Sequence, residues 1–412
     1  MPIEYLLGDD DRARYADAIV KTSLLLEKDD ILVVLAEPEH RELLVALAES
    51  AYRAGVRFVD VIDSDPLLMR ARVKYGPEES LGAVPPWALR RLRETTRPHG
   101  AFAAILGTGE AGYLDDVPPA RVATDFERRA KATAFLYRAH LRMTARWTAV
   151  GWPTDLWASR VYPDLDVLAA KRRLAADLLS FCRLTDEDGK GTSGWRKHLQ
   201  TLVRRSQRLT KLGLTRLELR GPGTELDLGF VPGTRWLGGP EEVAGTGKLV
   251  ASNMPTEEVF TSPDPRVTRG TFRCTFPLSH QGRLIEGLRG EFRGGRLVRL
   301  EADSDDDRDF LAAHLDVDRG GRRLGEVALV DASSRIGRAG RVFYDTLLDE
   351  NAAAHIALGA GFDGTRTERP VRGVNRSRTH VDVMIGGPEL EATGIDGRGR
   401  RIPLIRDGLW RI

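Results

Sequence analysis

DILVVLAEPEHRELLVALAESAYRAGVRFVDVID (30–63) is the stretch that decides the fold of the first half of the chain. Its first part, 30–37, is a short continuous apolar run, which is typical of a parallel strand buried on both faces. A helical pattern follows over 38–54 and ends at Gly55, and the apolar run at 56–63 predicts a second strand. The order of strand, helix and strand predicts parallel strands joined by a right-handed crossover.

The same alternation of strands and helices continues on both sides of this stretch. Further strands are expected at 101–108 and near 146–152, and helices at 10–26, 85–97, 118–140, 164–182 and 191–212. We therefore predict an N-terminal α/β domain with a parallel sheet over residues 1–213. The basic face of the 191–212 helix has few interleaved aromatic residues, so we interpret it as a solvated surface and not as a nucleic-acid site.

A glycine-rich segment follows the strand at 101–108. Gly107, Gly109 and Gly112 have the G-x-G-x-x-G spacing of dinucleotide loops, but such loops open a helix. Here YLDDVPP (113–119) follows instead. We interpret the segment as a loop near a domain interface and predict no nucleotide site.

After Gly213 the pattern of apolar and polar residues changes from long helical segments to short alternating segments separated by turns. LTRLELRG (214–221) alternates apolar and charged residues, which indicates an antiparallel strand with one solvated face. We place the domain boundary at 213–215 and predict a β-rich α+β C-terminal domain over 214–412. Helices are expected in this domain at 305–315 and 345–359.

The composition is that of an ordinary globular chain. Its 412 residues are 42% apolar, and 62 basic and 60 acidic residues give a net charge of +2, so no nucleic acid partner is implied. No apolar run approaches the ~18 residues that span a bilayer, and we expect no membrane association. Cys182 and Cys274 lie far apart, and the acidic start of the chain does not resemble a signal peptide. We therefore expect reduced thiols and a cytoplasmic location.

Two segments of the last third carry histidines beside carboxylates. In THVDV (379–383) the alternation predicts a strand, so His380 and Asp382 point to the same face. DENAAAHIALG (349–359) reads as an Ala-rich helix that ends at its glycine. On that helix Glu350 and His355 would lie roughly 140° apart at about 100° per residue, flanking one groove.

Two further carboxylates precede apolar strands. Glu326 begins EVALV, and Glu258 comes just before Val259 and Phe260. Acidic side chains are rarely buried unless they are paired or bind a metal. A single histidine or HxD motif is common by chance, but the whole set is rich in oxygen and suits two divalent ions such as Zn, Co, Mn or Mg.

Several blocks of this region resemble the thermophilic-type metallo-aminopeptidases, the family of aminopeptidases T, S and II. The blocks are NMPTEEVFTSPD (253–264), RRLGEVALVDASS (322–334), FYDTLLDENAAAHIALG (343–359) and HVDVMIGG (380–387). The resemblance implies a dinuclear metal site, a peptide or small amide substrate and a homodimer. Its metal ligands would be Glu258, Glu326, Glu350, His355, His380 and Asp382, and Glu326 would also act as general base.

One position departs from the family pattern. The family has a catalytic Tyr seven residues after the histidine that corresponds to His355. This chain has the sequence HIALGAGF there, with Phe362 at the position of the Tyr. Phenylalanine keeps the ring and loses the hydroxyl, and the loss of an oxyanion donor costs about 2.7–4 kcal/mol of transition-state stabilisation.

Two other classes of function remain open at this point. The first is an altered family member that acts as a biosynthetic amide hydrolase or as a binding protein, in which some of the arginines at 335–378 bind an acidic group of the ligand. The second is a mononuclear non-haem iron dioxygenase, which needs only two histidines and one carboxylate.

Overall fold

The computed structural model describes residues 5–107, 113–114, 116–281, 283–368 and 371–412. Gly109 and Gly112 of the glycine-rich segment lie outside these residues.

The chain divides into two compact units. The first comprises Met1–His198 and Pro240–Pro255, and the second comprises Leu199–Gly239 and Thr256–Ile412. The predicted domain boundary at 213–215 stays a prediction, and these units differ from it in 199–213 and 240–255.

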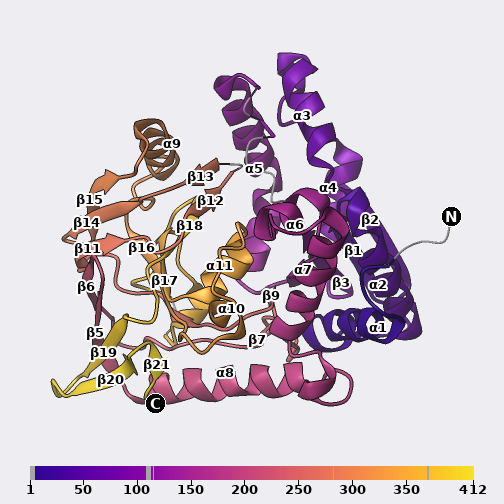
Figure 1. Cartoon of the computed structure of the whole chain (residues 1–412). Coiled ribbons are helices and arrows are strands. Elements are labelled where there is room, and N and C mark those ends of the chain that lie inside the picture. Colours follow the sequence, from indigo (N-terminus) through magenta and orange to yellow (C-terminus); the bar gives the residue numbers. More distant parts are fainter. Residues whose placement is uncertain (1–4, 108–112, 115, 282, 369–370) are drawn as a thin grey trace. The chain divides into compact units, whose positions relative to one another are not determined.

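A five-stranded parallel sheet forms the centre of the first unit (Figure 1). In spatial order its strands are β2 (Phe58–Asp63), β1 (Ile31–Ala36), β3 (Gly100–Leu106), β4 (Arg146–Gly151) and β9 (Asn253–Met254). The four predicted strands are confirmed, and Ile31 pairs in parallel with Phe58 on one side and Gly100 on the other. Strand β9 was not predicted from local pattern, and it pairs with β4 across about a hundred intervening residues.

Five of the helices in the first unit lie close to predicted ranges, whereas α3 and α6 were not predicted. They are α1 (Asp9–Ala18), α2 (Arg41–Arg53), α3 (Pro66–Tyr75), α4 (Pro86–Glu94), α5 (Pro119–Leu141), α6 (Asp155–Val161) and α7 (Val167–Phe181). A π-helical turn, Ile19–Ser23, follows α1, and the chain leaves the helix there, earlier than the predicted residue 26. Helix α2 ends at Gly55, whose φ of +89° lies in the region that glycine adopts without strain.

A buried ion pair joins the starts of two central strands of the first unit. Asp30 comes just before β1 and Arg146 begins β4, and their side chains are 1% and 2% exposed. The two guanidinium nitrogens donate to the two carboxylate oxygens at 2.6 and 2.7 Å. Such a bidentate pair compensates for the cost of removing both charges from water.

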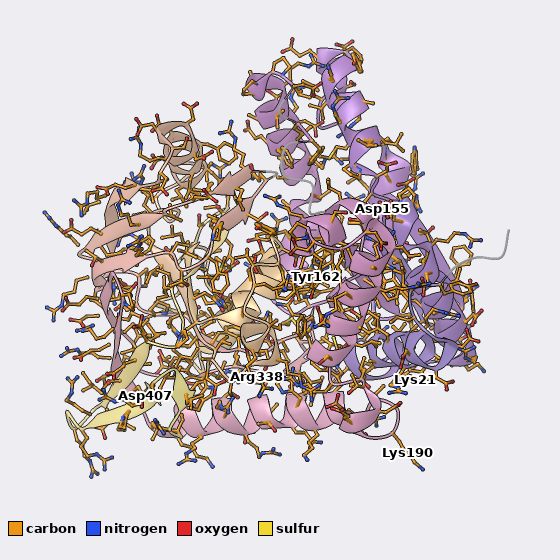
Figure 2. All side chains as sticks on the ribbon, in the orientation of Figure 1. Lys21, Asp155, Tyr162, Lys190, Arg338 and Asp407 are labelled. Atoms are coloured by element: carbon orange, nitrogen blue, oxygen red, sulfur yellow. The ribbon has the colours of Figure 1, made fainter. Side chains whose placement is uncertain are left out.

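We expect Asp30→Ala to lower the free energy of unfolding of the first unit by about 3–5 kcal/mol, because it leaves a buried guanidinium without its carboxylate. Lys21, labelled in Figure 2, pairs with Asp17 at 2.8 Å where both side chains are at least a third exposed. Lys21→Ala should therefore cost less than about 1 kcal/mol. Urea unfolding followed by circular dichroism measures both, and equal costs would contradict the expectation.

An eight-stranded antiparallel sheet forms one part of the second unit. In spatial order it contains β15 (Arg296–Glu301), β14 (Arg289–Arg293), β11 (Arg269–Arg273), β6 (Thr224–Gly229), β5 (Leu214–Gly221), β19 (Glu391–Asp396), β20 (Arg401–Arg406) and β21 (Leu409–Trp410). The alternation seen in LTRLELRG is realised here, because Leu217 and Leu219 are buried in the core of the unit.

A separate four-stranded antiparallel sheet carries the candidate site. Its strands are, in spatial order, β10 (Val259–Thr261), β16 (Leu324–Leu329), β17 (His355–Gly359) and β18 (His380–Met384). Every residue of the two central strands, β16 and β17, is buried.

The helix predicted over 345–359 is wrong in its second half. Helix α11 covers only Thr346–Ala352, and Ala353 is extended with φ −148° and ψ 155°. The chain then enters β17 at His355. The alanines favour a helix locally, but the apolar HIALG run pairs with strands on both sides, and this long-range pairing outweighs local propensity.

The remaining elements belong to both units, with β7 and β8 in the first. They are α8 (Ser193–Lys211), β7 (Glu241–Glu242), β8 (Leu249–Val250), β12 (Leu278–His280), β13 (Arg283–Ile285), α9 (Asp305–Leu315) and α10 (Arg335–Arg338). Helix α9 confirms the prediction at 305–315, and α8 lies within the predicted 191–212. Within the described residues, every helix is too short or too polar to cross a membrane.

Candidate metal centre

The register of the central strands brings the candidate residues to one face of the four-stranded sheet. Ala357 of β17 is paired with Glu326 on one side and with Asp382 on the other. Directly paired residues share a face, and so do residues two apart on one strand. His355 and His380 therefore lie on this face as well, because His380 is paired with Gly359.

Glu258 and Glu350 reach the same place from outside the strands. Glu258 immediately precedes β10, which pairs with β16, and Glu350 lies on the last turn of α11. Both side chains are buried. The six predicted residues thus come from four strands or strand ends and one helix.

Their ligand atoms form three overlapping groups in which all atoms lie within 4.8 Å of one another. The groups are Glu258, Glu326 and His355; Glu326, His380 and Asp382; and Glu350, His355 and Asp382. Each group shares one residue with each of the others, so the six side chains form one continuous cluster. All six predicted residues are brought together.

The orientation of both imidazoles is fixed by main-chain carbonyls. His355 donates through Nδ1 to the Glu350 carbonyl at 2.9 Å, and His380 donates through Nδ1 to the Ala360 carbonyl at 2.8 Å. This leaves Nε2 of His355 3.3 Å from Glu258, and Nε2 of His380 3.1 Å from Asp382. Metal-binding histidines commonly use such an outer hydrogen bond to set the tautomer and present the other nitrogen.

Burial perturbs the ionisation of the cluster. Burial raises the pKa of Glu326 to about 7, although the hydrogen bond from His380 opposes this shift. Burial, and then repulsion by Asp382, raise the pKa of Glu350 well above its ordinary value. Burial by itself would lower the pKa of His355, but the hydrogen bond with Glu258 and the surrounding carboxylates raise it to about 10.

This donor set fits divalent metal ions. The cluster holds four carboxylates and two imidazoles, which carry a formal charge of −4 when the imidazoles are neutral. Concentrated buried negative charge is costly unless cations offset it. The carboxylate oxygens and imidazole nitrogens are ligands that Zn, Mn and Co accept.

Phe362 lies beside this cluster. Its ring centroid is 5.4 Å from that of His380 and 5.2 Å from that of Phe260, in edge-to-face arrangements. The main-chain N–H of Phe362 donates to the Ser262 hydroxyl at 2.9 Å. An apolar ring therefore contacts a candidate ligand where the family pattern has a phenol.

Asn351 is a supporting residue that the sequence reasoning missed. Its side chain accepts from the main-chain N–H of Glu257 at 2.7 Å and donates to the Leu347 carbonyl at 2.8 Å. It thereby ties the segment that bears Glu258 to α11. Its place directly after Glu350 was the available signal in the sequence, and its complete burial is seen only in the structure.

Three of the arginines at 335–378 hold loops together. Arg376 forms an ion pair with Asp363 at 2.5 Å, and Arg378 forms one with Asp318. Arg366 is 2% exposed and donates to main-chain carbonyls. These contacts do not favour the idea that these three residues bind an acidic ligand.

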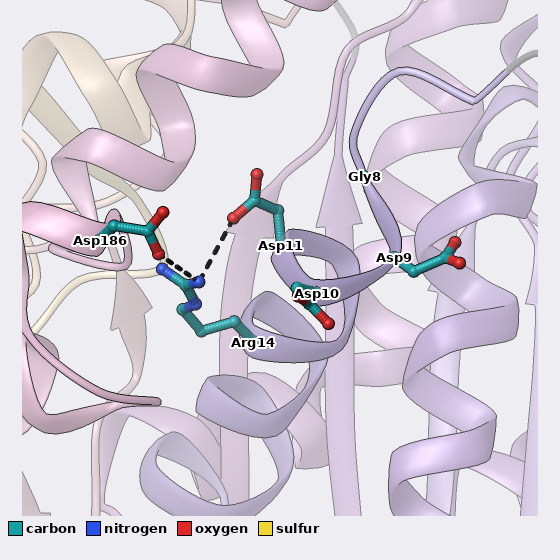
Figure 3. A pocket seen from close by; sticks show the side chains of 6 residues that line it. All are labelled: Gly8, Asp9, Asp10, Asp11, Arg14 and Asp186. Carbon is teal, nitrogen blue, oxygen red and sulfur yellow. Dashed lines mark hydrogen bonds and ion pairs between the residues drawn. The ribbon is translucent and has the colours of Figure 1, made fainter.

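A hollow of about 440 Å³ lies at the start of α1 in the first unit (Figure 3). It is lined by Gly8, Asp9, Asp10, Asp11, Arg14 and Asp186. Arg14 forms ion pairs with Asp186 at 2.7 Å and with Asp11 at 3.7 Å. Acids in the first turn of a helix stabilise its dipole, so the acidic lining is accounted for by the start of α1.

The raised pKa of Glu326 makes the stability of the metal-free protein depend on pH. Its folded-state pKa is raised from 4.5 to about 7, so its contribution to stability is complete below 4.5 and is lost as the pH rises through about 7. We expect the melting temperature in chelator to fall between about pH 5 and 8, and Glu326→Gln to reduce that fall.

Glu301→Gln is the matched control for this titration. Arg289 donates to Glu301 and lowers its pKa, so Glu301 does not titrate in this range. The control should follow the wild type in calorimetry. A Glu326→Gln curve as steep as the wild-type curve would contradict the assignment.

The chain is similar to known proteins over nearly its whole length. A family model described as thermophilic metalloprotease (M29) matches residues 9–410. Aminopeptidase T of Thermus thermophilus is 36% identical over 403 residues, which cover 96% of this chain and 97% of that protein. Aminopeptidase 2 of Geobacillus stearothermophilus is 33% identical over 405 residues, which cover 96% and 97%.

A solved structure gives the same relationship. Wild-type AmpT from Thermus thermophilus matches with a TM-score of 0.89 at 34% identity, covering 98% of this chain and 99% of that chain. The chain therefore belongs to the thermophilic metalloprotease family (M29) and is a hydrolase of the metallo-aminopeptidase type.

Proposed function

We propose that the protein is a dinuclear metal-dependent aminopeptidase that cleaves an N-terminal peptide bond or a related amide bond with a metal-activated water. The observation that carries this proposal is the set of three overlapping ligand groups around Glu326, His355 and Asp382. One ion needs three or four protein ligands, whereas six converging side chains suit two ions that share ligands. Zn, Co, Mn or Mg would fit this chemistry.

When bound, such ions lower the pKa of water and polarise the scissile carbonyl. Glu326 takes the role of general base, as the family resemblance implies. It belongs to two of the three groups, and burial raises its pKa to about 7, a value suited to accepting a proton. It accepts a proton from the attacking water and delivers it to the leaving amine. A carboxylate of the cluster also binds the free α-amine of the substrate, which restricts cleavage to the first residue.

The proposal includes a homodimer that acts in the cytoplasm on peptides or small amides. Membership of the family supports these points, together with the absence of a membrane-spanning helix among the described residues. Light scattering after size-exclusion chromatography measures the assembly, and a monomer would contradict it.

An altered activity is the second candidate, and Phe362 favours it. The ring beside His380 has no hydroxyl with which to stabilise an oxyanion, so turnover of simple peptides would be slow. The hypothesis of a mononuclear iron dioxygenase has less support. Its iron site needs two histidines and one carboxylate, whereas this cluster holds four carboxylates.

Metal dependence is the first test of the proposed function. We expect two divalent ions per chain by elemental analysis, cleavage of aminoacyl-arylamides with Zn, Co or Mn, and loss of cleavage in chelator. Glu326→Gln should lower kcat about 10²–10⁴-fold, because a general base contributes that much. Glu301→Gln, at a partly exposed position outside the cluster, should not change kcat. If the loaded protein cleaves no amide on a panel of N-terminal residues, the hydrolase assignment fails.

The missing hydroxyl is tested by Phe362→Tyr. We expect kcat to rise by up to about 10²–10³-fold, the effect of one oxyanion donor, with little change in KM. Phe260→Tyr adds a hydroxyl to the neighbouring ring and serves as the control, with no rise expected. An unchanged kcat for Phe362→Tyr would show that the phenol is not what limits this enzyme.

A further inference from the structure

The Phe362 ring is a partly exposed apolar surface next to a candidate metal ligand. Its edge-to-face contacts with Phe260 and His380 fix one side of the ring. Phe260 is 8% exposed and Phe362 is only half-buried, so part of the Phe362 ring remains accessible. Because His380 belongs to the cluster that would bind the scissile group, a substrate side chain held there meets this ring.

The main chain around Phe362 is held by hydrogen bonds to three different segments. Ala360 donates to the Thr379 carbonyl at 2.7 Å, and Gly361 donates to the Asn375 carbonyl at 3.0 Å. Phe362 donates to the Ser262 hydroxyl at the end of β10. These bonds hold residues 360–362, where the loop between β17 and β18 begins. They do not involve the middle of that loop, where Arg366 lies.

Arg366 closes the far side of this loop. One of its terminal nitrogens donates to the Ser262 carbonyl at 2.8 Å and to the Gly373 carbonyl at 2.7 Å. The other donates to the carbonyl and the hydroxyl of Thr365 at 3.0 and 3.1 Å, and Nε donates to the Arg372 carbonyl at 3.3 Å. The guanidinium thus ties the two described arms of this loop, 360–368 and 371–373, to Ser262, the residue that also anchors Phe362.

The environment of this guanidinium is unusual for a charged group. Arg366 is 2% exposed, and burial lowers its pKa to about 10. A buried cation is retained only where its hydrogen bonds offset the cost of leaving water. The planar fork of arginine can serve several carbonyls at once, which lysine cannot do.

We propose that Arg366 is a positioning residue for substrate selection: by tying the loop to the end of β10, it holds the Phe362 ring against His380 as an apolar wall for the N-terminal side chain of the substrate. The preferred class is peptides or amides with an apolar or aromatic first residue, because a charged side chain would lose hydration against the ring. This inference rests on the proposed aminopeptidase function.

Arg366→Met tests the tie, because methionine approximates the length of the side chain and lacks its donors. Arg372→Met is the matched control on the same stretch of chain, since the Arg372 side chain is exposed. In metal-free protein, hydrogen exchange of a peptide that covers 358–375 should rise in Arg366→Met and stay at the wild-type level in Arg372→Met. Unchanged exchange in Arg366→Met would overturn the tie.

The selectivity between two substrates shows whether Arg366 positions the Phe362 ring or only stabilises the fold. We expect Arg366→Met to lower the ratio of kcat/KM for leucyl- over lysyl-arylamide by about tenfold, mainly through KM. Arg366→Lys should give an intermediate ratio. In a Phe362→Ala background, Arg366→Met should leave the ratio unchanged within about twofold, because the ring through which it acts is gone.

The possible outcomes distinguish this inference from the proposed function. Equal changes of the ratio in both backgrounds would show that Arg366 acts without Phe362 and would overturn the inference alone. A wild-type protein that binds metal but cleaves no amide would overturn the proposed function, and the selection role with it. If Arg366→Met has the hydrogen-exchange rate and the leucyl-to-lysyl ratio of the wild type, Phe362 is positioned by Ser262 without Arg366. This result would overturn the inference.

Discussion

The second unit depends on the burial of six ionisable side chains on one face of a small antiparallel sheet. Carboxylates removed from water repel one another strongly, and here burial raises the pKa of both Glu326 and Glu350. The two imidazoles offset only part of this charge, since each is shared among several carboxylates. Divalent cations convert the same repulsion into attraction, so metal binding and the stability of this sheet are coupled.

Space for these groups comes from small residues on the central strand. Ala357 lies between Glu326 and Asp382, so no large side chain separates the carboxylates. Gly359 lies opposite His380 with a φ of +105°, and a Cβ there would come 2.1 Å from the Thr379 carbonyl. The motif HIALG is therefore a constraint on shape as well as a source of one ligand.

The side of the site next to His380 has an apolar ring in place of charged groups. There the chain uses a buried guanidinium and main-chain carbonyls to fix an apolar ring, with Arg366 and Phe362 meeting at Ser262. In the proposed function the cluster provides the reactivity, and in the further inference the ring and its loop select the substrate.

Much of the fold was predictable from local pattern. Continuous apolar runs identified the parallel strands β1 to β4, and alternation placed His380 and Asp382 on one face of β18, because both signals depend only on the geometry of a strand. The family blocks predicted the six residues that the structure brings together, since the blocks depend on residue type and order, and the departure at Phe362 stays a prediction.

The tertiary structure decided the rest. His355 reads locally as helical, yet it begins β17, because two distant strands offer it hydrogen-bonded partners that no local pattern contains. Asn351 and Arg366 gained their roles in the same way, through contacts with segments up to about a hundred residues away. The sequence by itself determined which groups are available for chemistry. Only long-range strand pairing and buried hydrogen bonds decided how those groups meet.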